Sequence, residues 1–232
     1  AELIAAHDVP VILKDIDDDA LTVGLRYARE LLDKAGQAQV FAAHEAGLKF
    51  ALIHGTLTYE KFDDVDLVIE AVVERMAVKK NVLREAEEVL PKHAVFATNT
   101  SSLSVTELAQ AAVRPAEVVG MHFFNPVHKM PLVEIIGTEL SSDAALATAF
   151  KFANDLGKTP VLVADQPGFL VNRLLAPYLN EVGFSLEGGA SVVSIDHALT
   201  AFGMPMGPCR ILDEVGFDVA EHVAKEMERA FG

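Results

Sequence analysis

The chain has 232 residues, of which 51% are hydrophobic, which is enough apolar material for one large domain or two small ones. Its formal net charge of −15 argues against a nucleic acid or an anionic membrane as a partner, because both are negatively charged. No apolar run reaches the roughly 18 residues that span a bilayer. We expect no signal peptide, because the first charge is acidic. The single cysteine, Cys209, excludes an internal disulfide and is consistent with a reducing compartment.

Short apolar runs alternate with amphipathic stretches in the first half of the chain. The apolar runs predict strands or strand edges at 9–13, 50–53, 55–57, 66–72 and 94–98. The amphipathic stretches predict helices at 1–7, 20–34, 37–49, 78–90 and 104–112. Asp17 or Asp18 is expected to cap the second of these helices, which should end near Gly36. In the third, His44 is interpreted as a solvated residue and not as a ligand.

A predicted hairpin follows, and it carries the main catalytic hypothesis. Residues 118–124 and 132–136 are apolar and flank a turn that contains two prolines. If the midpoint of the hairpin is His128, then His122 and Glu134 face each other with Cβ atoms roughly 5 Å apart. A carboxylate on one imidazole nitrogen raises the basicity of the other, which is the arrangement of a general base. The alternative is a structural histidine that has an acid nearby by chance.

The chain changes character near residue 165. A helix is predicted over 143–156, with Ser142 as its cap and Gly157 at its end, followed by a strand over 160–164. Beyond 165 only helices are predicted, at 170–184, 194–202 and 208 to the end, with a break near Gly216. We therefore predict an α/β domain over 1–165, with a mostly parallel sheet and an antiparallel hairpin at one edge. A smaller all-α domain is predicted over 166–232.

Polar residues follow three of the predicted strands, where open parallel sheets bind their ligands. Asp15 is placed to accept hydrogen bonds from a ribose diol and to repel a 2′-phosphate, or it is an ordinary loop aspartate. The acids of 70–74 are ligand contacts or plain charges at a helix start. The hydroxyls of 99–102 donate to a substrate oxygen or cap the next helix.

Several common motifs are absent from the sequence or do not fit it. It contains no Gly-x-Gly-x-x-Gly loop, no His-Glu-x-x-His motif and no paired-cysteine motif, so no metal site is expected. Gly188-Gly189 lies in the helical half and precedes no strand-to-helix turn. Gly207-Pro208-Cys209 is rejected as a nucleophile loop, because it lies among helices without a nearby base.

Four ordered motifs together resemble one family, L-3-hydroxyacyl-CoA dehydrogenase, and most closely the dehydrogenase part of multifunctional fatty-acid oxidation proteins. The motifs are Asn99-Thr100-Ser101-Ser102-Leu103, His122-Phe123-Phe124-Asn125-Pro126, Pro131-Leu132-Val133-Glu134 and Pro167-Gly168-Phe169-Leu170-Val171-Asn172-Arg173-Leu174. The resemblance covers nearly the whole chain and implies a Rossmann-like fold.

The resemblance also implies roles for individual residues. It implies that NAD-dependent oxidation of an L-3-hydroxyacyl-CoA uses His122 as the base, Glu134 to orient it, and Ser101 and Asn172 as hydrogen-bond partners of the reacting oxygen. It implies cofactor contacts at Asp15, Ala71, Glu74, Lys79, Asn99 and Asn125. The same resemblance implies an acyl-CoA substrate and either a homodimer or a multienzyme complex. It also implies a cytoplasmic location, with the mitochondrial or peroxisomal matrix as alternatives.

The sequence departs from the family pattern at its beginning, where the first strand and the Gly-rich turn are missing. The amides of that turn normally hold the pyrophosphate. We therefore expect this chain alone to bind NADH weakly and to self-associate through an unpaired strand edge. There are two alternative interpretations of the function. One is an inactive relative that serves as a structural or interaction domain. The other is a different 3-hydroxyacid dehydrogenase, which fits the fold but not the stretch 122–126.

Overall fold

The computed structural model describes residues 1–216, 221, 224–225 and 228. They form two compact units, the first made of 1–100 and 105–162 and the second of 101–104 and the chain from 163 on. The short segment 101–104 therefore belongs with the helical unit, although both neighbouring stretches belong to the first unit. The boundary predicted between residues 165 and 166 stays a prediction.

The first unit is built from seven strands and short to medium helices. Its strands are β1 (Val11–Lys14), β2 (Ile53–Thr56), β3 (Leu67–Glu70), β4 (Val95–Thr98), β5 (Val118–Phe123), β6 (Leu132–Gly137) and β7 (Thr159–Ala164), whose last two residues fall in the second unit. Its helices are α1 (Glu2–Ala6), α2 (Asp18–Gln37), α3 (Glu45–Phe50), α4 (Met76–Glu87), α5 (Val105–Ala109) and α6 (Asp143–Asp155), with 3₁₀ turns η1 (Phe62–Asp64) and η2 (Pro115–Glu117).

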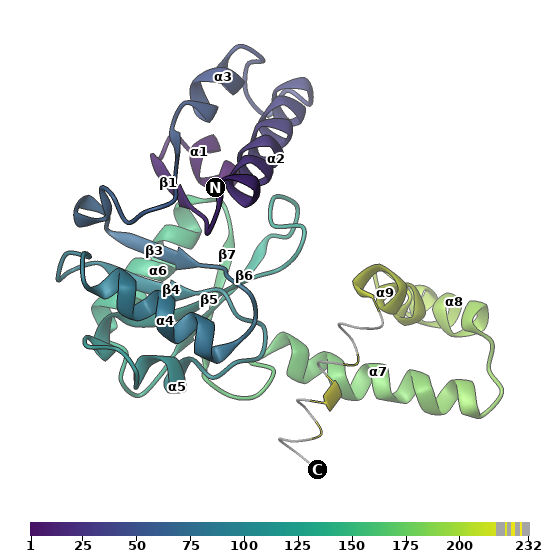
Figure 1. The fold of residues 1–232 in the computed structure, drawn as a ribbon. Coiled ribbons are helices and arrows are strands. Elements are labelled where there is room, and N and C mark those ends of the chain that lie inside the picture. Colours follow the sequence, from purple (N-terminus) through teal and green to yellow (C-terminus); the bar gives the residue numbers. More distant parts are fainter. Residues whose placement is uncertain (217–220, 222–223, 226–227, 229–232) are drawn as a thin grey trace. The chain divides into compact units, whose positions relative to one another are not determined.

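The strands form two sheets (Figure 1). One contains the parallel pair β1 and β2, and the other has the order β3-β4-β5-β6-β7. Strands β3, β4 and β5 are parallel, whereas β5 and β6 form the predicted antiparallel hairpin. The α/β class and the antiparallel pair are thus confirmed. Strand β7 lies beyond β6, so the hairpin is one strand in from the edge of the sheet.

The main core lies between helix α6 and the five-stranded sheet. Three alanines of α6, Ala145, Ala149 and Ala153, are fully buried and leave room for the helix to approach the sheet closely. Val119 and Met121 of β5 pack in this cluster. Because side chains alternate along a strand, Gly120 and His122 point to the opposite face. That face is covered by α5, since a Cβ at Gly120 would meet Val105 at 3.0 Å.

The helix caps predicted from the sequence are present. The Asp17 carboxylate accepts a hydrogen bond from the Ala20 amide at 2.8 Å and caps α2. The Ser142 hydroxyl accepts one from the Ala145 amide at 3.1 Å and caps α6. Helix α6 ends just before Gly157, whose φ of +69° is a conformation that glycine adopts without strain. These local signals define the two helices without help from tertiary contacts.

The region between α2 and β2 differs from the prediction. Helix α2 ends at Gln37, one residue after Gly36, as predicted, and a Cβ at Gly36 would lie 3.3 Å from the Cα of Ala43 as the chain folds back. The helix predicted over 37–49 is reduced to α3, and the two strand edges predicted at 50–53 and 55–57 are one strand, β2. Pairing with β1 decides this last point, because it extends the whole of β2 in one register.

Helices make up the second unit: α7 (Val171–Glu187), α8 (Val192–Phe202) and α9 (Pro208–Val215). The predicted continuation beyond Gly216 falls largely outside the described residues. In the part of the chain that the structure describes, no helix combines the length and apolar character needed to cross a membrane.

The Gly207-Pro208-Cys209 stretch has a structural role. The Asp196 carboxylate accepts hydrogen bonds from the Cys209 and Arg210 amides at 2.8 and 3.2 Å and so caps α9. A Cβ at Gly207 would lie 2.2 Å from Cγ of Asp196, so only glycine allows this approach. Burial, followed by the nearby Asp196 carboxylate, raises the pKa of the Cys209 thiol. A thiol that stays protonated is a poor nucleophile.

Candidate functional site

His122 and Glu134 form a buried pair across the hairpin. Their register is direct, as predicted, and Nδ1 of His122 lies 2.6 Å from a carboxylate oxygen of Glu134. The two side chains are 8% and 0% exposed. The ring of Phe124 lies 4.4 Å from the imidazole, centroid to centroid. Because the carboxylate binds Nδ1, it fixes the tautomer and leaves proton transfer to Nε2.

The loop of the hairpin is held by a lysine that the sequence reasoning did not single out. Lys158, the residue before β7, is only 9% exposed, and its ammonium donates hydrogen bonds to the carbonyls of Val127 and Met130. Burial lowers its pKa. The loop contains a cis peptide bond before Pro126, and it presents Asn125 on the surface. No local pattern marks Lys158, because its partners lie 28 and 31 residues away in the chain.

A second buried ion pair lies where β3 and β4 end. The ammonium of Lys79 lies 2.9 and 3.2 Å from the two carboxylate oxygens of Glu70, and these side chains are 1% and 0% exposed. Lys79 also donates to the Asn99 carbonyl at 3.3 Å and lies 3.3 Å from the Glu74 carboxylate. The carboxylate of Glu74 accepts in addition from the Thr100 hydroxyl at 2.5 Å. Three predicted cofactor residues, Glu74, Lys79 and Asn99, are therefore brought together.

Asn99 joins this cluster to the strand that carries His122. Its amide donates to the carbonyl of Glu70 at 2.7 Å, and its side-chain oxygen accepts from the Phe123 amide at 3.1 Å. The ends of β3, β4 and β5 are thus connected through one asparagine. Its position next to both groups makes Asn99 a link between the cofactor residues and the histidine.

Asp15 and Ala71 lie directly after β1 and β3. The amide of Asp15 continues the pairing of the strand by donating to the Thr56 carbonyl at 3.2 Å, and its carboxylate accepts from the Ile16 amide at 2.8 Å. Asp15 is partly exposed and Ala71 is exposed. Both are accessible at the carboxyl ends of parallel strands, where a dinucleotide is expected.

Ser101 and Asn172 are neighbours within the second unit. The side-chain amide of Asn172 donates to the backbone carbonyl of Ser101 at 3.3 Å. Close by in sequence, the Ser104 hydroxyl donates to Asp165 at 2.8 Å, so the segment is tied twice to the chain beyond residue 163. The fold thus brings together two residues that are 71 positions apart in the chain, and their predicted role at the reacting oxygen stays a prediction.

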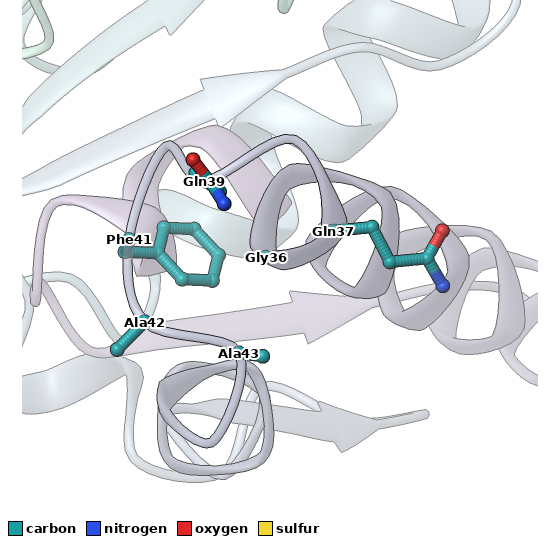
Figure 2. Close-up of a pocket in the computed structure, with 6 residues that line it drawn as sticks. All are labelled: Gly36, Gln37, Gln39, Phe41, Ala42 and Ala43. Atoms are coloured by element: carbon teal, nitrogen blue, oxygen red, sulfur yellow. The ribbon is translucent and has the colours of Figure 1, made fainter.

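A hollow of about 600 Å³ lies away from these groups, at the turn between α2 and α3 (Figure 2). It is lined by Gly36, Gln37, Gln39, Phe41, Ala42 and Ala43, none of which is a predicted site residue. Its lining carries no titratable group, so we assign it no chemistry. Among the described residues, no group of three or more His, Cys, Asp or Glu side chains could hold a metal ion.

The polar groups fit a dinucleotide on chemical grounds. Hydrogen-bonding oxygens of Asp15, Glu74 and Asn99 follow three strands, and none of these residues is fully buried. Such oxygens match the hydroxyls of a ribose. The buried Lys79 is different, since its side chain is directed into the protein.

Two family models match the chain almost end to end. Residues 1–166 match the NAD binding domain of 3-hydroxyacyl-CoA dehydrogenase, and residues 168–232 match its C-terminal domain. The fatty acid oxidation complex subunit alpha of Acinetobacter baumannii (strain SDF) is 44% identical over 227 residues. That match covers 98% of this chain but 32% of the relative, so the chain spans about a third of the length of this curated relative.

Solved structures show the same fold. FadB2 of M. tuberculosis is 37% identical with a TM-score of 0.94, and the match covers 99% of this chain and 82% of that one. The (S)-3-hydroxybutyryl-CoA dehydrogenase PaaH1 of Ralstonia eutropha is 33% identical with a TM-score of 0.95, over the same shares of the two chains.

Proposed function

Because the chain belongs to the 3-hydroxyacyl-CoA dehydrogenase family, we propose that it oxidises an L-3-hydroxyacyl-CoA to the 3-oxoacyl-CoA in fatty-acid β-oxidation, with NAD as the cofactor. The observation that carries the proposal is the buried His122–Glu134 pair, with its 2.6 Å contact between imidazole and carboxylate. A histidine oriented in this way is suited to take a proton from a hydroxyl group.

In the proposed reaction the protein moves the proton. Nε2 of His122 accepts the proton of the 3-hydroxyl while Glu134 stabilises the imidazolium through Nδ1. The nicotinamide supplies the hydride chemistry when the cofactor is bound. In the reverse direction Nε2 returns the proton to the oxygen.

Ser101 and Asn172 would act on the same oxygen. A hydroxyl and a side-chain amide are both donors, and donors aimed at the reacting oxygen stabilise charge that develops on it. Their contact through the Ser101 carbonyl supports a shared role, because it orients the Asn172 side chain beside Ser101.

Asp15, Ala71, Glu74, Lys79, Asn99 and Asn125 would contact the cofactor. The partial exposure of Asp15 at the end of β1 supports a contact with the adenosine ribose, as does its position after a parallel strand. Ala71 offers a surface without a bulky side chain next to this edge. Asn125 is exposed on the hairpin loop, close in sequence to His122.

Asp15 should set the preference for NAD over NADP. Its carboxylate repels a 2′-phosphate, so Asp15→Ala is expected to narrow the preference, measured as the ratio of kcat/KM for the two cofactors. Asp19→Ala removes the same charge four residues later, at an exposed position of α2, and should leave the ratio unchanged. Equal use of both cofactors by the unmutated protein would contradict the assignment.

The function is tested by acetoacetyl-CoA-dependent oxidation of NADH, followed with the full-length protein. Turnover that disappears in His122→Ala supports the proposal. A folded protein that binds neither NADH nor acetoacetyl-CoA would identify it as an inactive relative with a structural role. Turnover of other 3-hydroxyacids without the CoA ester would identify a different dehydrogenase.

The relatives suggest where such a protein works. The curated relative is named as a subunit of a fatty acid oxidation complex, and we propose a similar assembly, or a homodimer, for this protein. A cytoplasmic location would fit the bacterial source of that relative. Size-exclusion chromatography of the full-length protein distinguishes the assembly states.

A further inference from the structure

Glu70 has no role in the proposed reaction, yet its carboxylate is among the most fully satisfied groups in the first unit. It accepts from the Val72 amide at 2.7 Å, from the Thr98 hydroxyl at 2.6 Å and from the ammonium of Lys79 at 2.9 and 3.2 Å. Its side chain is 0% exposed. Hydrogen bonds from several donors hold this carboxylate in one position, and the carboxylate in turn fixes the position of the Lys79 ammonium.

Stability alone does not explain this pair. Taking two charges out of water carries a large desolvation penalty, and apolar residues of similar volume are often as stabilising or more so. Apolar residues, however, cannot donate directed hydrogen bonds as the ammonium does. The Lys79 ammonium contacts two groups at the strand ends, the carbonyl of Asn99 and the carboxylate of Glu74.

The contacts extend from these two groups toward the histidine. Asn99 accepts from the Phe123 amide through its side chain, and Phe123 is the residue after His122. Glu74 accepts from the Thr100 hydroxyl, which lies directly before Ser101. One buried ammonium therefore sets the position of two surface-facing polar groups that belong to different strand ends.

We propose that Glu70 is a positioning residue for the nucleotide site: it holds Lys79, and Lys79 holds Glu74 and Asn99 in the arrangement that binds the cofactor. The inference rests on the proposed function for the ligand, but its geometry stands on the contacts themselves. Lys79 is also a predicted cofactor contact, and its 1% exposure means that most of its own contacts lie inside the protein.

The test compares Glu70→Gln, Lys79→Met and the double variant in the full-length protein. Each single variant leaves one buried charge without its partner and should lower Tm, whereas the double variant removes both charges and should recover much of that loss. If the pair positions the site, NADH binding stays weak in the double variant, with a Kd raised about tenfold or more, because Glu74 and Asn99 have lost their contact with the Lys79 ammonium.

Coupling between the two residues gives the sharper result. If Glu70 acts through Lys79, then Glu70→Gln raises the Kd for NADH in the parent protein but changes it less than about twofold when Lys79→Met is already present. If Glu70→Gln binds NADH with the same Kd as the parent, then Glu70 has a purely structural role. If the factors by which the two substitutions raise the Kd for NADH multiply in the double variant, then Glu70 does not act through Lys79.

A matched control comes from another buried lysine of the same unit. Lys49 is 5% exposed and donates to the Ala6 carbonyl and the Asp8 carboxylate, both at 2.8 Å. Lys49→Met should therefore lower Tm in the manner of Lys79→Met, while the Kd for NADH stays at the parent value. A similar rise in Kd for this variant would mean that any destabilised form binds weakly, and would overturn the inference.

Hydrogen exchange tests the geometry without the cofactor. The amides of Asn99 and Phe123 should exchange faster in the double variant than in the parent or in Lys49→Met, because the loop at 99–100 is no longer held. Unchanged exchange at both amides would overturn the inference. If the unmutated protein does not bind NADH, the proposed function fails, and this measurement still decides the role of Glu70.

Discussion

Replacing His122 with alanine, or Glu134 with glutamine, is expected to lower kcat by about 10²–10⁴-fold in the full-length protein. The first change removes the proposed base, and the second removes the charge that orients and polarises it across 2.6 Å. Stopped-flow or steady-state oxidation of NADH with acetoacetyl-CoA measures the loss. KM for the acyl-CoA should change little, since neither side chain is proposed to bind the CoA moiety.

The pair should act as a unit. Groups that share one catalytic step are strongly non-additive, so the double variant should be little slower than His122→Ala alone. His128→Ala, in the exposed loop of the same hairpin, is the control and should retain activity. Losses that multiply independently would contradict a shared role for the two residues.

Gly120→Ala should be among the most destabilising single changes in the sheet, at about 1–3 kcal/mol of the free energy of unfolding or somewhat more. An added Cβ would lie 2.8 Å from Cβ of Ile136, the residue directly opposite on β6, and 3.0 Å from Val105 of α5. Denaturant unfolding measures the loss. Because His122 follows two residues later on the same face, spreading β5 from β6 should also lower kcat.

Gly47→Ala is the matched control for this substitution. Gly47 lies in helix α3, and no atom lies within 4 Å of an added Cβ. Alanine there should stabilise the protein by up to about 1 kcal/mol, because glycine is the poorer helix former. Gly120→Ala with the stability and activity of the parent would contradict the close packing of the hairpin against α5.

The register of the hairpin was determined by the sequence. Two apolar runs lie symmetrically about His128, so a hairpin centred there pairs residues that are equally far from His128. That pairing puts His122 opposite Glu134, as the structure shows. The caps at Asp17 and Ser142 are equally local, since each acts on an amide three residues away.

Tertiary contacts decided where the local signals failed. Two strand edges were predicted at 50–53 and 55–57, but the structure has one strand, β2, which is continuous because β1 pairs along its whole length. A segment distant along the chain supplies this constraint, and local propensity does not contain it.

The buried lysines show most clearly what the sequence alone leaves out. Nothing in the sequence indicates that Lys79 and Lys158 are buried, because an ammonium is rarely buried without a partner. Their partners, Glu70, the carbonyl of Asn99 and the carbonyls of the hairpin loop, come from other strands and loops. The sequence therefore predicted which residues carry the chemistry, through the hairpin pattern and the motifs that resemble the family. Only the folded chain determined which charges hold those residues in place, because that depends on acceptors brought together from separate segments.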